Sequence, residues 1–163
     1  MSTFSTRARH ARRAAIAAGV LFAALGFTSA AVAGDCPADQ FKVGAREPVP
    51  TPATGVTDTV LASIDLAKEP VKLNDHLQRV RKLVIEPGGV VPWHSHTDRP
   101  ALIYIIEGEI VEYASNCSVP IVHKAGDVRA ETQGTSHWWK NLGTKTVTLL
   151  SFDILHDTHD HNM

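Results

Sequence analysis

The sequence predicts an all-β protein with a single domain, on three observations. Its 163 residues are the length of one domain. Short runs rich in β-branched residues recur about every 8–12 residues and are separated by turns that contain glycine, a spacing typical of β-sandwiches and barrels. Beyond residue 33, no segment keeps a helical period of apolar residues over more than about ten residues. We therefore expect strands throughout the domain.

Residues 1–33 are expected to be a secretory signal peptide rather than part of the fold. Arginines between Arg7 and Arg13 form a basic start, residues 14–27 are apolar without a charge, and the segment ends in Ala31-Val32-Ala33. An apolar run of about 14 residues is too short to span a bilayer, which needs about 20. We expect cleavage after Ala33, a periplasmic or secreted protein, and no membrane anchor after signal cleavage.

Prolines and apolar alternation divide the remaining chain. Four of the nine prolines lie within residues 34–56, which predicts an extended N-terminal arm. Residues 57–156 are expected to form the β-domain, followed by a flexible tail rich in His and Asp at 157–163. Alternation of apolar and polar residues, or a short apolar run, predicts strands at 57–66, 77–85, 90–96, 101–106, 110–114, 119–123, 128–131, 136–140 and 145–155.

Turn signals separate these strands. The sequence Glu-Pro-Gly-Gly at residues 86–89 is expected to be a turn that ends one strand before the next begins at residue 90. Glycines at 108, 126, 134 and 143 mark the later turns. The tail carries His156, His159 and His161, and such a cluster either scavenges metal or is a solvated C-terminus.

The net charge bears on possible partners, and the two cysteines bear on a possible disulfide. The net charge is -1, from 16 basic and 17 acidic side chains, so no nucleic-acid partner is expected. The two cysteines, Cys36 and Cys117, both follow the expected cleavage position. In an oxidising compartment an even pair is expected to form a disulfide, which would pin the arm to a loop of the domain. The alternative is two free thiols.

Three histidines suggest a metal site. His94 and His96 are separated by one residue, and residues i and i+2 of a strand point to the same face, so both imidazoles would enter the same space. His137 follows about forty residues later in the sequence GTSHWWKN. We expect these three side chains to bind one metal ion.

With these histidines placed, the sequence resembles the cupin family, whose first motif is G(X)5HXH(X)3-4E(X)6G. Gly88, His94, His96 and Gly108 fall on it at the right spacing. The second motif, G(X)5PXG(X)2H(X)3N, is matched by the residues Gly126, Gly134, His137 and Asn141. The resemblance covers about residues 78–155 and is similar to small single-domain bacterial cupins. It implies a jelly-roll β-barrel with a metal in its mouth, and a homodimer formed by strand exchange or sheet packing.

The chain departs from the family pattern at one ligand. The glutamate of the first motif should stand four or five residues after His96, where this chain has Pro100 and Ala101. The resemblance therefore transfers only the three histidines as ligands. Asp98 could replace the missing carboxylate if the strand continued, although Asp-Arg-Pro at residues 98–100 looks like a bend.

The ligands do not identify the metal, which is expected to be a divalent ion of Fe, Mn, Ni, Zn or Cu. Near the histidines, Arg99 could hold an anion of a small-molecule ligand through a bidentate contact, or it forms an ordinary salt bridge. Tyr104 and Trp139 could line a substrate pocket, or they belong to the core. Glu131 and Asp127 lie near the second motif in the sequence, but no catalytic acid or base is identified.

Three functions are compatible with these features. The first is a metal-dependent oxidoreductase of the cupin kind, a dioxygenase with quercetinase-like activity. The second is a non-catalytic periplasmic module that binds a small ligand or a metal. The third is a structural barrel without metal. The fold alone does not choose among them.

Overall fold

The fold is almost entirely β-structure. The computed structural model describes residues 34–156, and within that range the regular structure is one short 3-10 helix, η1 (Ala38–Gln40), and β-strands. The strands are β1 (Thr54–Asp65), β2 (His76–Ser95), β3 (Ala101–Glu107), β4 (Glu109–Ala114), β5 (Ile121–Lys124), β6 (Val128–Glu131), β7 (Ser136–Lys140) and β8 (Val147–His156). The expected all-β class is confirmed.

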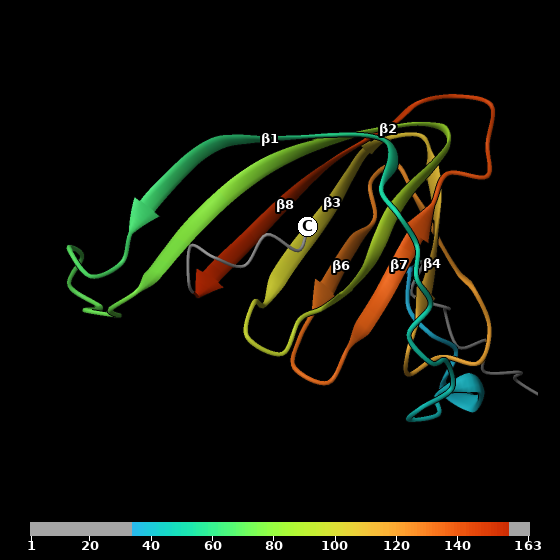
Figure 1. Ribbon diagram of the computed structural model, residues 1–163, viewed down its shortest axis with the longest axis horizontal. Coiled ribbons are helices and arrows are strands. Elements are labelled where there is room, and N and C mark those ends of the chain that lie inside the picture. Colours follow the sequence, from blue (N-terminus) through green and yellow to red (C-terminus); the bar gives the residue numbers. More distant parts are fainter. Residues whose placement is uncertain (1–33, 157–163) are drawn as a thin grey trace, which may run out of the picture. The chain divides into compact units, whose positions relative to one another are not determined.

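The strands form one strongly curled antiparallel sheet (Figure 1). Its order is β5-β4-β7-β2-β8-β3-β6, with β1 paired to β2 beside this path. β5 and β6 stand at opposite ends of that order, yet only residues 125–127 connect them. The sheet must therefore curl back on itself into a half-barrel. Two backbone hydrogen bonds of this connection hold it against β3, Gly126 N to Ile105 O at 2.9 Å and Ile105 N to Asp127 O at 3.1 Å.

One long strand, β2, replaces the two strands expected from the sequence. The predicted turn at residues 86–89 is wrong, because β2 runs unbroken for 20 residues through it. The Pro-Gly-Gly sequence instead marks the place where β2 changes partner: residues 76–85 pair with β8, and β7 pairs with β2 only from Val90. Gly88 takes a φ of +78° there, and a Cβ at Gly89 would lie 2.8 Å from the carbonyl oxygen of Glu86. Glycine thus allows a bend within the strand.

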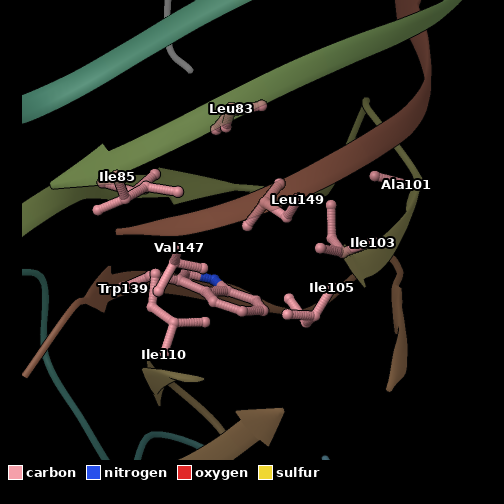
Figure 2. Close-up of a cluster of buried hydrophobic side chains, with 10 residues drawn as sticks. Leu83, Ile85, Ala101, Ile103, Ile105, Ile110, Trp139, Val147 and Leu149 are labelled. Atoms are coloured by element: carbon pink, nitrogen blue, oxygen red, sulfur yellow. The ribbon is translucent and has the colours of Figure 1, made fainter. Parts of the chain in front are cut away.

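The hydrophobic core lies on the concave face of the sheet. Alternate residues point inward, so Ile103 and Ile105 of β3 are buried while the intervening Tyr104 is exposed. Figure 2 shows the inward side chains of this core, which come from β2, β3, β4, β7 and β8 and include Trp139. The same face continues into buried polar residues, among them His94, His96, Glu112, His123, Glu131 and His137. The core and the candidate site therefore share one wall.

The N-terminal arm is fastened to the sheet. Cys36 and Cys117 are joined in the disulfide expected from the sequence, with Cα atoms 5.8 Å apart. Phe41 forms a backbone bridge to Cys117, and Cys117 is buried with Ala114 and Ile121 in a second small apolar cluster. A disulfide fits an oxidising environment. The expected signal peptide and the tail at 157–163 lie outside the described residues.

Between residues 34 and 156, the structure contains no helix with the length and apolarity that a membrane crossing requires.

The disulfide should contribute measurably to stability. The double variant Cys36→Ser/Cys117→Ser is expected to lose about 2–4 kcal/mol of unfolding free energy, because the bond closes a loop with a sequence separation of 81 residues. Urea denaturation of the oxidised wild type and the variant measures this difference. Reductant should destabilise the wild type and leave the variant unchanged; equal stability of both proteins would contradict a structural role for the bond.

Candidate metal centre

Four buried side chains converge on the concave face of the sheet. His94 lies near the end of β2 and His137 in β7, and the two are direct partners across this antiparallel pair. His96 follows immediately after β2, where its backbone N–H donates to Thr135 O. Glu131 ends β6 and is only 1% exposed. Each of the four offers one ligand atom, and these atoms all lie within 4.8 Å of one another.

The distances within this cluster are short. His137 Nε2 lies 3.0 Å from His96 Nε2 and 3.2 Å from His94 Nε2. The Glu131 carboxylate approaches His96 Nε2 at 2.9 Å and His137 Nε2 at 3.3 Å. Two atoms that are each about 2.1 Å from one ion and at right angles to each other lie about 3.0 Å apart. The cluster has the spacing of ligands around a transition metal ion.

The outer nitrogens fix which ring atoms face inward. His94 Nδ1 lies 2.8 Å from Pro92 O, His96 Nδ1 lies 2.8 Å from Arg99 O, and His137 Nδ1 lies 2.6 Å from Glu112 Oε1. Each partner is an acceptor, so each Nδ1 carries the hydrogen. In the neutral rings, three Nε2 lone pairs and a carboxylate then meet in one space. Such a set requires a positive charge at its centre, which a bound cation would supply.

The electrostatics of the rings agree with that requirement. Burial, and then the neighbouring His137, hold the pKa of His94 well below its usual value, so this ring stays neutral. Burial would also lower the pKa of His137, but the charges of Glu131 and Glu112 outweigh it and raise this pKa. The carboxylates therefore favour a cation at His137, whether a proton or a metal ion.

Glu131 is the carboxylate that sequence reasoning missed. Its register partner across the β3–β6 pair is Ala101, the position where the first motif would place its glutamate. Directly opposite residues of an antiparallel pair share one face with Cβ atoms about 4.5–5.5 Å apart, so Glu131 reaches the space that a glutamate at 101 would occupy. The small side chain of Ala101 leaves that space open. Asp98, the replacement considered from sequence, is exposed outside the cluster.

A second carboxylate contacts His137 at Nδ1, the ring nitrogen that faces away from the cluster. Glu112 of β4 is fully buried and accepts hydrogen bonds from His137 Nδ1 at 2.6 Å and His123 Nε2 at 2.8 Å. Burial would raise the pKa of Glu112, but the hydrogen bonds from the two histidines outweigh it and lower this pKa far below its usual value. Arg129 lies 3.3 Å from the same carboxylate and reaches Asp35 at 2.8 Å. Glu112 thereby fixes the orientation of His137.

A small cavity adjoins the cluster. Its volume is about 30 Å³. It is lined by Arg81, Leu83, Val91, His94, His96, Ile103, Glu131, Trp139, Leu149 and Ser151. One water needs about 10–15 Å³ by this kind of measure, so the cavity has room for about two water-sized molecules. Arg81 is engaged in ion pairs with Asp58 and Asp153.

The three residues that the sequence suggests as substrate contacts lie in different places. Trp139 lines the cavity, but it is also a core residue, stacked on His123 with ring centroids 4.5 Å apart. Arg99 is buried, and its carbonyl oxygen accepts from His96. Tyr104 is 41% exposed on the outer face of β3, so the structure does not bring it to the cluster. Strand alternation explains this, since Ile103 and Ile105 take the inward positions.

The curled β-sheet thus gathers three histidines and a carboxylate that could hold a metal ion on its concave face. The cupin domain family matches residues 81–153 of the sequence, from β2 into β8. Residues 81–153 are thus a cupin domain, and the match includes all four residues of the cluster. A search of the curated proteins finds no match to the sequence.

Several solved structures are similar to this chain, all at low sequence identity. The cupin domain of Cnp3 from Schizosaccharomyces pombe is 17% identical, with a TM-score of 0.48 over 64% of this chain and 67% of that one. KdgF from Halomonas sp. is 16% identical, with a TM-score of 0.48 over 63% and 82%. Oxalate oxidase in complex with the substrate analogue glycolate is 22% identical, with a TM-score of 0.48. That match covers 64% of this chain and about half, 52%, of the oxalate oxidase chain.

The relation between Ala101 and Glu131 can be tested by exchanging them. Glu131→Ala is expected to weaken binding of a divalent metal at least about tenfold, the effect of losing about 1.4 kcal/mol. Adding Ala101→Glu should recover part of this loss, because the carboxylate returns to the same space from the opposite strand. Isothermal titration with Zn(II) measures both variants. Equal binding by Glu131→Ala and wild type would contradict a ligand role for Glu131.

Proposed function

We propose that this protein is an exported metal-binding cupin whose centre, formed by His94, His96, Glu131 and His137, holds a divalent transition metal and presents it to a small molecule. The observation that carries the proposal is the meeting of four ligand atoms, each on a buried side chain, with every inner nitrogen left as an acceptor. Imidazole ligands suit Fe, Ni, Cu and Zn, and the carboxylate adds Mn to this range.

The protein's own residues would hold the metal and exclude bulk water. The carbonyl oxygens of Pro92 and Arg99 and the carboxylate of Glu112 keep the three rings turned with Nε2 inward. Leu83, Val91, Ile103, Leu149 and Trp139 form an apolar wall beside the cluster. Such a wall strengthens the interaction between the centre and any charge that enters the cavity.

The polar side chains that line the cavity indicate which kind of reaction the site could support. Apart from the cluster, the polar residues that line it in the described part of the chain are Arg81 and Ser151. Arg81 faces two carboxylates and donates to the Ser151 hydroxyl at 3.4 Å, so both polar side chains are already engaged in contacts within the protein. We therefore propose oxidoreductase, dioxygenase-like activity, for which a bound metal would supply the Lewis-acid and redox chemistry.

The size of the cavity favours a substrate much smaller than a flavonol. Pockets for drug-sized ligands measure about 300–1,000 Å³, whereas this cavity is about 30 Å³. A quercetinase-like substrate would have to remain largely outside. The same small volume favours the second candidate function, a non-catalytic module that binds the metal with at most water or a small anion.

Export and self-association complete the proposal. The Cys36–Cys117 disulfide supports a periplasmic or secreted location, in agreement with the signal sequence expected at residues 1–33. On the convex face, Phe152 and Leu102 are register partners and are 44% and 52% exposed. This apolar surface supports a homodimer formed by sheet packing. Light scattering of the purified protein should give the mass of a dimer, and a monomer at all concentrations would contradict it.

Metal content and oxygen uptake test the proposed function together. The purified wild type, stripped by a chelator and reloaded separately with Fe(II), Mn(II), Ni(II), Cu(II) or Zn(II), should hold one such ion at the centre. His94→Ala should lose that ion with its circular dichroism unchanged. Oxygen consumption with small carboxylic acids, thiols and flavonols should then appear with a redox-active metal.

Tyr104→Phe, on the outer face, is the matched control and should behave as wild type. A wild type that cannot be loaded with any of these metals would overturn the proposal. A loaded protein without oxygen uptake on any substrate of the panel would overturn the enzyme and leave the binding module.

A further inference from the structure

Arg129 links the start of the N-terminal arm to the metal centre. Its Nη1 donates to Asp35 Oδ1 at 2.8 Å, and its Nε lies 3.3 Å from Glu112 Oε2. The other oxygen of Glu112 accepts a hydrogen bond from His137 Nδ1 at 2.6 Å. Asp35 is therefore connected to a ligand of the centre through two charged side chains, Arg129 and Glu112.

Gly34 brings the arm into contact with the same group of residues. It is buried, its φ is +90°, and a Cβ at this position would lie 2.8 Å from Nδ1 of His123. Glycine is needed here, because any side chain would clash with the ring and would be strained at this φ. The Nε2 atom of that ring donates to Glu112 at 2.8 Å. Two successive residues of the arm thus contact the two partners of Glu112 that do not bind metal.

The disulfide holds this part of the arm in place. Cys36 follows Asp35 directly and is bonded to Cys117, which is fully buried. The Asp35 side chain is 53% exposed, so its ion pair with Arg129 would be weak if the arm were mobile. A covalent bond at the next residue removes much of the entropy cost of keeping the two charges together.

The charge of Arg129 opposes a cation at the centre, and Asp35 offsets it. Burial lowers the pKa of His137, the carboxylates of Glu131 and Glu112 raise it, and the charge of Arg129 acts to lower it. Without Asp35, Arg129 would draw more strongly on Glu112 and weaken the hydrogen bond that this carboxylate accepts from His137. An imidazole with a weaker partner at Nδ1 is a poorer ligand at Nε2.

We propose that Asp35 and Arg129 are positioning residues of the metal centre, through which the N-terminal arm strengthens metal binding while the disulfide holds it. The inference rests on the function proposed above, since the centre must bind a divalent metal. Asp35 lies outside the residues matched by the cupin family, 81–153, whereas Arg129 and Glu112 lie within them. The arm therefore adds a contact that the matched domain does not itself contain.

Competition for Zn(II) between the stripped protein and a chromophoric chelator measures the contribution of the arm. Asp35→Asn removes the charge and keeps the size of the side chain. It should weaken Zn(II) binding about twofold to fivefold, the range of one partly exposed ion pair. Asp39→Asn is the matched control and should bind as wild type, because Asp39 is an exposed aspartate of the same arm whose carboxylate accepts from its neighbour Gln40.

A double-mutant cycle separates positioning from a general loss of stability. In the Arg129→Met background, Asp35→Asn should leave Zn(II) affinity unchanged, because the charge that it offsets is gone. In Cys36→Ser/Cys117→Ser the arm is released, so Asp35→Asn should again have little further effect. The first cycle keeps the disulfide, so it remains decisive if loss of that bond unfolds the protein.

Proton NMR of the metal-free protein gives a second measurement. The Nδ1–H resonance of His137 reports on its hydrogen bond to Glu112. This resonance should shift in Asp35→Asn and stay unchanged in Asp39→Asn, whereas a purely structural role of the arm would not distinguish the two variants.

Equal Zn(II) affinity of Asp35→Asn and wild type would overturn the inference and leave the metal centre intact. An effect of Asp35→Asn that is equally large with and without Arg129 would overturn it as well, since the loss would not pass through that residue. A wild type that binds no Zn(II) would instead count against the centre itself, and this inference would fall with it. The wild-type titration therefore distinguishes the two failures.

Discussion

Four electron-pair donors packed into one buried space are the constraint on which this structure depends. Three imidazole nitrogens and one carboxylate point at each other across about 3 Å, which is costly unless a positive charge lies among them. The surrounding fold holds these groups in place despite their mutual repulsion. Backbone carbonyls and Glu112 hold the rings, and the curl of the sheet brings β2, β6 and β7 to the same place. The four-residue cluster therefore depends on the curl of the half-barrel.

The long strand β2 connects the hydrophobic core with the four-residue cluster. Its first half pairs with β8 and carries Leu83 and Ile85 into the core, while its second half pairs with β7 and carries His94 into the centre. The bend at Gly88 and Gly89 lets this one strand pair with β8 beside the core and with β7 beside the cluster. β2 contributes Leu83, Ile85 and Val91 to the core cluster of ten residues. Packing leaves these side chains few alternative conformations, so the strand positions His94 better than a loop would.

The sequence was informative where the signal is local and silent where it depends on strand pairing. The sequence predicts His94, His96 and His137 as one cluster, because a two-residue spacing and two motifs are visible along the chain. The all-β class followed from alternation, and most strand positions followed from turn residues. Glu131 could not be identified as a neighbour of these histidines, since that depends on the register of β6 against β3. At residues 86–89 the sequence predicts a turn where β2 continues, because glycine and proline are common both in turns and in bends within strands.

The pairing of Ala101 with Glu131 has a consequence for how families are searched. In an antiparallel sheet, a side chain that fills a given space can come from either of two strands, which lie thirty residues apart in this chain. A pattern that demands an acidic residue after the histidine pair would discard this protein, although a carboxylate stands in that space. Losses of a functional residue inferred from aligned sequences should thus be checked against the partner strand. In some of these proteins, an equivalent side chain will fill the same space from another position in the sequence.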